Sequence, residues 1–201
     1  MQLSLLFNKI NDNFVELPEN KNAVKLLQKF YQRVQNVADF KEESFSNIII
    51  KGSLDCGKNY LLKNFAANNC NNQNINFLDH DKINDLEFLA SLKKHNLYII
   101  ENADCLEDEV LLRLINFSQE KQIFIVLSLS SFVNFKLKDL TSRLKNIPSA
   151  TIENLSLDSI KYLLSAILSQ NQINLSQAKI KKIAQNVDRS YQAVINYVKN
   201  I

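Results

Sequence analysis

The most constraining feature of this 201-residue chain is the stretch GSLDCGKN, residues 52–59. It holds both glycines of the chain, Gly52 and Gly57, and lies between an apolar run, SNIIIKG, and a helical pattern, LLKNFAANN. A G-x-x-x-x-G-K loop between a strand and a helix can bind phosphate, because its backbone N–H groups and its lysine converge on one anion. The alternative is a chance Gly/Lys turn. We expect a phosphate-binding loop here.

This predicted loop departs from the common pattern at one position. Lys58 is expected to reach the β- and γ-phosphates, but Asn59 stands where Ser or Thr normally ligates Mg²⁺. An amide oxygen can bind Mg²⁺ but is neutral, so we expect phosphate binding to survive better than fast hydrolysis. The nucleotide-binding residues predicted in this stretch are Gly52, Asp55, Cys56, Gly57, Lys58, Asn59 and Tyr60.

Strand-like and helix-like segments alternate up to about residue 154. Strands are expected at 46–52, 74–81, 96–104, 122–130 and 149–154, and helices at 21–36, 83–94, 107–121 and 136–146. This alternation predicts an α/β fold with a mostly parallel sheet covered by helices on both faces. Three further helical segments predict a small all-helical lid. The expected division is a tail at 1–12, a nucleotide-binding α/β domain at 13–154 and the lid at 155–201.

Acidic side chains lie at the end of the third predicted strand, in YIIENAD, residues 98–104. Glu101 is expected near a bound metal, which makes Asn59 and Glu101 the candidate Mg²⁺ ligands, and Asp104 would polarise a water. Asp is usual at the first of these acidic positions and Glu at the last. Because the Asp and Glu side chains are exchanged here, their different lengths displace the carboxylates by more than about an ångström. Such a displacement can reduce the rate of hydrolysis by orders of magnitude. Alternatively, the two acids only cap the strand end.

Three more polar residues stand where a bound nucleotide could be sensed. Ser128, in IVLSLSS, is expected at the end of the fourth strand. Arg143, in DLTSRL, precedes the last strand, and Arg189, in NVDRSYQAV, opens the last helix. These are two of only four arginines, and an arginine supplied to a partner's nucleotide can raise hydrolysis by roughly 10³–10⁵. An ordinary surface role is the alternative for each arginine.

The order of these motifs resembles the AAA+ module of the bacterial replication initiator DnaA. The resemblance covers about residues 13–201 and begins at NFVELPENKNAV, which is similar to the family's approach to the adenine pocket. It implies a bound ADP or ATP, with Mg²⁺ as a possible companion. It also implies that Arg143 is an arginine finger acting in trans and that Arg189 senses nucleotide. Ser128 corresponds to the family's strand-end Thr or Ser, although the D-R-P that follows there is replaced by SSF, residues 130–132.

The first residues, QLSLLF, are similar to the sliding-clamp-binding peptide of bacterial replication proteins, Q-L-x-L-x-[L/F]. An extended peptide of this kind places an amide and several apolar side chains in a preformed groove. The alternative is an apolar start that packs on its own domain. The residues concerned are Gln2, Leu3, Leu5, Leu6 and Phe7.

A clamp motif joined to a DnaA-like module without a helix-turn-helix domain is similar to the Hda-like regulatory inactivators of DnaA. The resemblance implies a cytoplasmic adaptor that binds the sliding clamp (the DNA polymerase III beta subunit) and DnaA. It would repress initiation by promoting ATP hydrolysis on DnaA, being itself a weak or inactive ATPase. Two other functions stay open: an ATPase motor with its own turnover, and a scaffold without nucleotide. A homo-oligomer is also compatible with the resemblance.

Composition argues against other classes of protein. The net charge of +3 is too small to indicate a nucleic-acid surface, so we expect no direct sequence-specific DNA binding. No apolar stretch approaches the roughly eighteen residues of a membrane span, and the N-terminus lacks the features of a secretory signal. Cys56, Cys70 and Cys105 have no metal-ligand spacing, and we expect reduced thiols. Residues 79–81, Asp-His-Asp, are expected to be a loop rather than a metal site.

Overall fold

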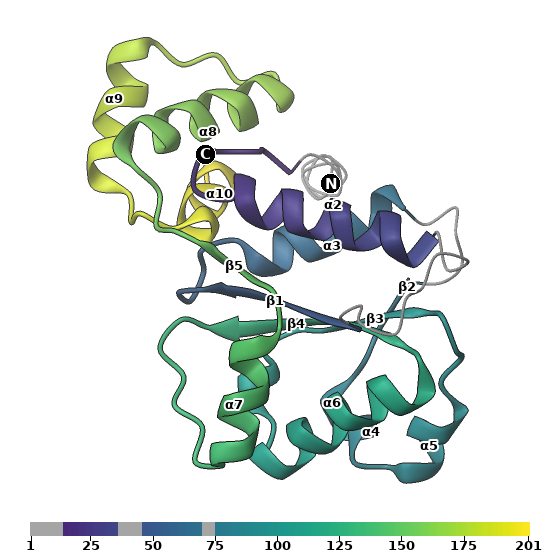
Figure 1. Cartoon of the computed structure of the whole chain (residues 1–201). Coiled ribbons are helices and arrows are strands. Elements are labelled where there is room, and N and C mark those ends of the chain that lie inside the picture. The colour runs from purple at the N-terminus through teal and green to yellow at the C-terminus, as the bar shows by residue number, and fades with distance from the viewer. Residues whose placement is uncertain (1–13, 36–45, 70–74) are drawn as a thin grey trace.

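The computed structural model describes residues 14–35, 46–69 and 75–201. Within these ranges one parallel sheet has the strand order β2-β3-β4-β1-β5 (Figure 1). The expected α/β fold with a parallel sheet is confirmed. The strands are β1 (Asn47–Gly52), β2 (Ile75–Phe77), β3 (Leu97–Ile100), β4 (Phe124–Ser130) and β5 (Ser149–Ile152).

Helices cover both faces of the sheet (Figure 1). Helices α2 (Lys21–Gln35) and α3 (Lys58–Asn68) lie on one face, and α6 (Asp108–Lys121) and α7 (Lys138–Asn146) lie on the other. Alternate residues of a strand point to opposite faces. Ile48 and Ile50 of β1 therefore pack in the core with α2 and α3, while Ile49 packs in the core with α6 and α7. The central strand is buried on both sides, so it reads as a continuous apolar run.

The helix expected over 83–94 is instead two short helices, α4 (His80–Ile83) and α5 (Leu86–Ser91). Asp85 caps α5, because its carboxylate accepts a hydrogen bond from Glu87 N at 2.9 Å. A capping aspartate favours a new helix start over a continued helix. The expected strands at 74–81 and 96–104 are shorter in the structure, because a helix begins within each expected range. These are α4, which begins at His80, and the short 3₁₀ helix η3 (Ala103–Cys105), which follows β3.

The expected C-terminal helical part consists of α8 (Leu157–Gln170), α9 (Gln177–Asn186) and α10 (Tyr191–Lys199). Ser156 and Ser190 cap α8 and α10, accepting hydrogen bonds from Ser159 N at 3.2 Å and Ala193 N at 3.1 Å. The three helices share a small apolar core of their own. We call them the lid, and they stand beside the sheet and its covering helices (Figure 1). None of the helices in the described ranges is long and apolar enough to cross a membrane.

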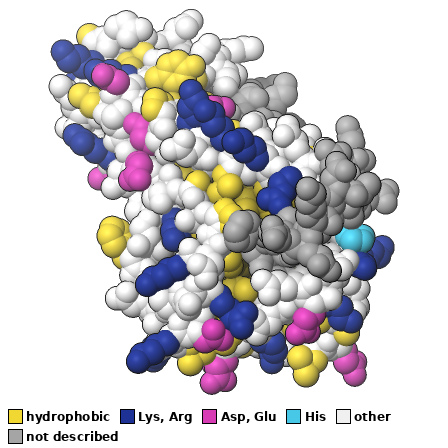
Figure 2. All heavy atoms as spheres, viewed as in Figure 1, with side chains coloured by type: hydrophobic (Ala, Val, Ile, Leu, Met, Phe, Trp, Pro, Cys, Tyr) yellow, Lys and Arg dark blue, Asp and Glu magenta, His cyan; other side chains and the backbone are white. Residues whose placement is uncertain are grey.

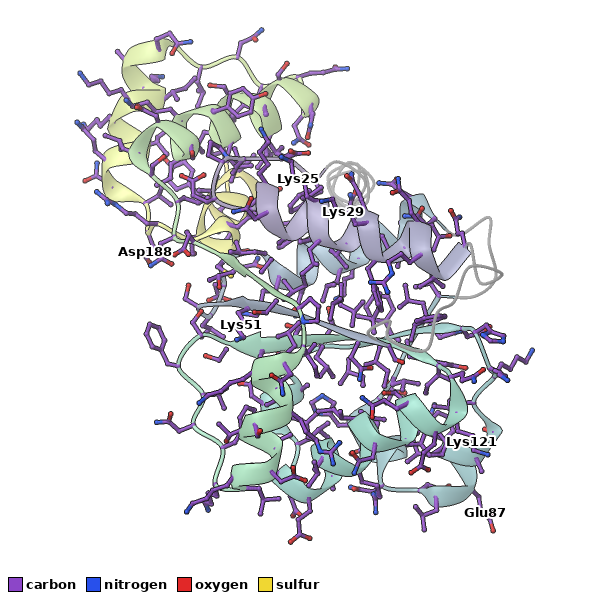
Figure 3. The ribbon with its side chains drawn as sticks, in the orientation of Figure 1. Lys25, Lys29, Lys51, Glu87, Lys121 and Asp188 are labelled. Atoms are coloured by element: carbon purple, nitrogen blue, oxygen red, sulfur yellow. The ribbon has the colours of Figure 1, made fainter. Side chains whose placement is uncertain are left out.

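Positive and negative side chains are mixed on the face shown in Figure 2. Lys25 and Lys29, one turn apart on α2, point away from the sheet (Figure 3), and both are exposed. Asp188 lies at the junction of the lid with the sheet (Figure 3). Among the described residues in this view, a band of hydrophobic side chains lies between groups of charged ones, and Lys and Arg side chains form a short row beside it.

The leading segment, residues 14–20, connects the lid to the sheet. Leu17 packs in the apolar core of the lid, and α2 begins directly afterwards on the sheet. Asn20 is only 2% exposed and closes the segment into a turn. Its Oδ1 accepts a hydrogen bond from Leu17 N at 2.9 Å, and its Nδ2 donates to Val15 O at 3.1 Å. The Asn20 amide thus satisfies backbone groups that would otherwise be left without a partner.

We predict that Asn20→Ala lowers the free energy of unfolding by about 1–3 kcal/mol, because the buried Leu17 N–H loses its acceptor. The control Asn22→Ala, at an exposed position of α2, should change it by less than about 0.5 kcal/mol. Urea unfolding followed by circular dichroism measures both. Equal losses in the two variants would contradict the role given to Asn20.

Candidate functional site

The predicted phosphate loop joins β1 to α3, and its two glycines meet different needs. Gly57 is the N-cap residue of α3 with φ 105°, a left-handed conformation that glycine adopts without strain. Gly52 allows close packing: a Cβ there would collide with Cys56 Sγ and lie 3.0 Å from Ile152 O. The loop therefore folds back over the end of β1, beside β5.

Lys58 is bonded inside the loop. Its Nζ donates to Gly52 O and to Ser53 O, both at 2.8 Å, and the residue is only 7% exposed. Cys56 Sγ lies 3.9 Å from the same Nζ. Burial raises the pKa of the Cys56 thiol even though the nearby ammonium opposes the rise. Lys58, which is expected to reach the phosphates of a nucleotide, thus donates its hydrogen bonds to carbonyl groups of its own loop.

The cavity beside the loop is small, about 110 Å³. Small-molecule sites typically measure about 300–1,000 Å³. The residues that line the cavity are Leu54, Asp55, Gly57, Lys58, Asn59, Tyr60, Asn102 and Gln192. As lined by the described residues, this cavity is smaller than a typical small-molecule site.

The lid covers the loop at the start of α10. A Cβ at Gly57 would lie 3.0 Å from Tyr191 Cβ and Cγ, so this side chain is packed directly on the loop. Gln192 N also donates a hydrogen bond to Asp55 O at 3.2 Å. Sequence reasoning missed Tyr191 and Gln192. The available signal was their position, just after Arg189 at the beginning of an amphipathic helix.

The two acids after β3 have different surroundings. Glu101 Oε1 is buried without a hydrogen-bond partner among the described residues. Burial raises the pKa of Glu101, opposed by the charge of Lys63. Asp104 Oδ1 accepts a hydrogen bond from Ser130 N at 3.2 Å, so this acid is bonded to the end of β4. Neither acid forms a cluster with other acids, His or Cys that could hold a metal, within the part of the chain that the structure describes.

Ser128 lies two residues inside β4 rather than at its end. It is fully buried beside Ile50, and its hydroxyl lacks a partner among the residues described. Ser130, which sequence reasoning did not select, is the last residue of the strand and pairs with Gly52 of the loop. The alternating serines of SLSS are the signal that could have indicated it. The nucleotide contact of Ser128 stays a prediction.

The two selected arginines lie in different parts of the molecule. Arg143 Nε is 3.3 Å from both carboxylate oxygens of Asp139 on α7, and the Arg143 side chain is 40% exposed. Because α7 leads from the carboxyl end of β4 to the amino end of β5, its last turn lies away from the loop. Arg189 is exposed in the turn before α10. The clamp motif, Gln2–Phe7, and Cys70 lie outside the described residues.

Solved structures provide the comparison that decides the fold. AMPPCP-bound DnaA from Aquifex aeolicus is similar with a TM-score of 0.74 and 15% identity, over 95% of this chain and 63% of that chain. Domain III of DnaA from Thermotoga maritima gives 0.70 and 17%, over 94% and 85%. The chain has the same fold as these DnaA domains. The AAA+ fold extends to the more distant Thermotoga maritima RuvB branch migration motor, with a TM-score of 0.60 and 18% identity, over 89% and 60%.

The AAA+ match covers this chain almost completely but only part of the longer relatives. The chain spans 63% of the length of the Aquifex aeolicus DnaA structure. No family model matches the sequence, and no curated protein matches it.

A pH-dependent contribution to stability is predicted from Tyr191. Burial raises its pKa from 10.0 to about 12, against the hydrogen bond from Val15 N. The folded state therefore favours the protonated phenol. Its contribution is complete below pH 10 and is lost as the pH rises towards 12. We expect the free energy of unfolding to fall between pH 10 and 11 by on the order of 1 kcal/mol more in the wild type than in Tyr191→Phe.

The matched control is Tyr197→Phe, because Tyr197 is on the same helix and 40% exposed. This variant should keep the pH dependence of the wild type. Urea unfolding at each pH gives the comparison, and equal slopes for wild type and Tyr191→Phe would contradict the assignment.

Proposed function

We propose that the protein is a DnaA-related AAA+ adaptor that promotes ATP hydrolysis on the replication initiator DnaA and so represses initiation. The observation that carries the proposal is the exposed position of Arg143 in the last turn of α7, where its partner is Asp139 of the same helix rather than the protein's own loop. A guanidinium so placed can reach a nucleotide that another subunit holds. The similarity to DnaA structures supports an AAA+ partner of the same type.

Arg143 is free to change partners. Its ion pair with Asp139 joins side chains that are 40% and 60% exposed, and such surface pairs contribute only about 0–1 kcal/mol. A triphosphate offers more negative charge and fits the planar guanidinium with two parallel hydrogen bonds. The arginine can therefore leave Asp139 when a partner's nucleotide approaches.

The protein's own site supports the adaptor role, because it is poorly equipped for hydrolysis. Asn59 lacks the hydroxyl that normally ligates Mg²⁺, and Asp104 is bonded to Ser130 N. The AMPPCP-bound DnaA structures support an adenine nucleotide, ADP or ATP, as the ligand class of the loop when it is open. Asn59 and Glu101 would then be the residues nearest to a Mg²⁺ ion. We assign no chemical step to this site.

Docking on the sliding clamp is the second part of the proposal. The QLSLLF motif, residues 2–7, supplies one amide and several apolar side chains for a preformed groove. Docking would concentrate the adaptor at clamps loaded on DNA, where the initiator is to be inactivated. The adaptor would act in the cytoplasm without a DNA contact of its own.

We predict that Arg143→Ala abolishes the stimulation of ATP hydrolysis by DnaA, measured as phosphate release with DNA-loaded clamp present. Arginine fingers supply roughly 10³–10⁵ in rate, so the residual rate should equal that of DnaA alone. Arg143→Lys should fail as well, because an ammonium lacks the planar fork. Arg33→Ala, an exposed arginine on α2 across the sheet, is the control and should stimulate like the wild type. Full stimulation by Arg143→Ala would refute the mechanism.

The clamp interaction is tested separately by a pulldown with the purified sliding clamp. Gln2→Ala combined with Leu5→Ala should lose binding, because both the amide and an apolar anchor are removed. Ser4→Ala changes the unconstrained position of the motif and should retain it. Binding by the double variant at the wild-type level would mean that the clamp is not recognised through this motif.

A further inference from the structure

Three aromatic rings are packed where the lid meets the phosphate loop: Phe14, Tyr60 and Tyr191, here called the aromatic cluster. Tyr191 stacks on Phe14 with centroids 5.6 Å apart and an interplanar angle of 19°. Tyr60, on the first turn of α3, lies 5.3 Å from Tyr191. Tyr191 is only 2% exposed. The cluster thus connects the leading segment, α3 and α10.

The cluster is held in place by hydrogen bonds on two sides. Val15 N donates to the Tyr191 hydroxyl at 3.0 Å, which fixes the far end of the ring. Gln192 N donates to Asp55 O at 3.2 Å, which fixes the start of α10 against the loop. The ring itself lies on Gly57, where even one added carbon would approach it to 3.0 Å. Tyr191 is therefore positioned by the loop, and the loop is covered by Tyr191.

The cavity that the described residues leave at the loop is smaller than a typical small-molecule site. A triphosphate bound by the loop N–H groups needs continuous room for its ribose and base. The cavity there measures about 110 Å³, and Tyr60 and Gln192 form part of its wall. Lys58 Nζ is meanwhile bonded to the carbonyls of Gly52 and Ser53. Phosphate-binding residues are present, but the protein's own side chains leave little room beside them.

We propose that the aromatic cluster makes the resting protein nucleotide-excluding, with Tyr191 as the residue that blocks the site. Lid closure on the loop and nucleotide binding are then mutually exclusive, and a nucleotide binds only after α10 has moved off Gly57. The apparent affinity is reduced by the fraction of molecules in which the lid is open. This inference does not depend on the adaptor role, because its test requires neither DnaA nor the clamp.

The experiment is titration calorimetry of the full chain with ADP, and with ATP in the presence of Mg²⁺. Wild type and Tyr191→Phe should both bind weakly or not at all, because both keep a ring on Gly57. Tyr191→Ala removes the ring and should bind at least about tenfold more tightly. Adding Lys58→Ala to Tyr191→Ala should abolish the gained binding, which would locate the nucleotide at the loop.

Circular dichroism checks that each variant is folded. Should Tyr191→Ala fail to fold, Tyr60→Ala takes its place, because Tyr60 is partly exposed and lines the same cavity. Micromolar binding by the wild type, unchanged in the variant, would overturn the proposal. Absence of binding in both the wild type and a folded variant would overturn it too, since the ring would then not be what excludes nucleotide. Binding that persists without Lys58 would place the nucleotide elsewhere and would also count against it.

Discussion

The burial of β1 on both of its faces is the constraint on which the rest of the molecule depends. Three consecutive isoleucines, Ile48 to Ile50, are at most 2% exposed and fill the two cores alternately. A strand of this kind must lie inside a parallel sheet, here between β4 and β5. Its carboxyl end therefore emerges between those of β4 and β5, where it can meet the start of a helix, the end of β4 and the lid together.

The layout of the fold could be predicted from the sequence because its signals are local. Short β-branched runs marked the strands, and amphipathic spacing marked the helices. The errors arose where one side chain overrides the local pattern. Asp85 starts a new helix within a segment that reads as one helix, and Ser128 lies two residues before the end of β4, an end that the sequence predicted correctly at residue 130. A capping side chain can move the start of a helix by a residue or two without altering the periodicity of the apolar residues.

The state of the site could not be predicted in the same way. The GxxxxGK pattern indicates that Lys58 is near the loop, but its bonds to Gly52 O and Ser53 O depend on the closed form of that loop. The contact between Tyr191 and Gly57 depends on the angle at which the lid meets the sheet. That angle follows from packing between residues far apart in the chain. Periodicity predicts that Tyr191 is buried but not which surface buries it.

The hydrogen bond from Val15 N to the Tyr191 hydroxyl spans 176 residues of sequence. During synthesis the leading segment leaves the ribosome well before its partner on α10. Domains tend to fold as their residues emerge, and contacts of long sequence separation form late. The sheet can therefore assemble with the phosphate loop still uncovered, and the lid closes on the loop only afterwards.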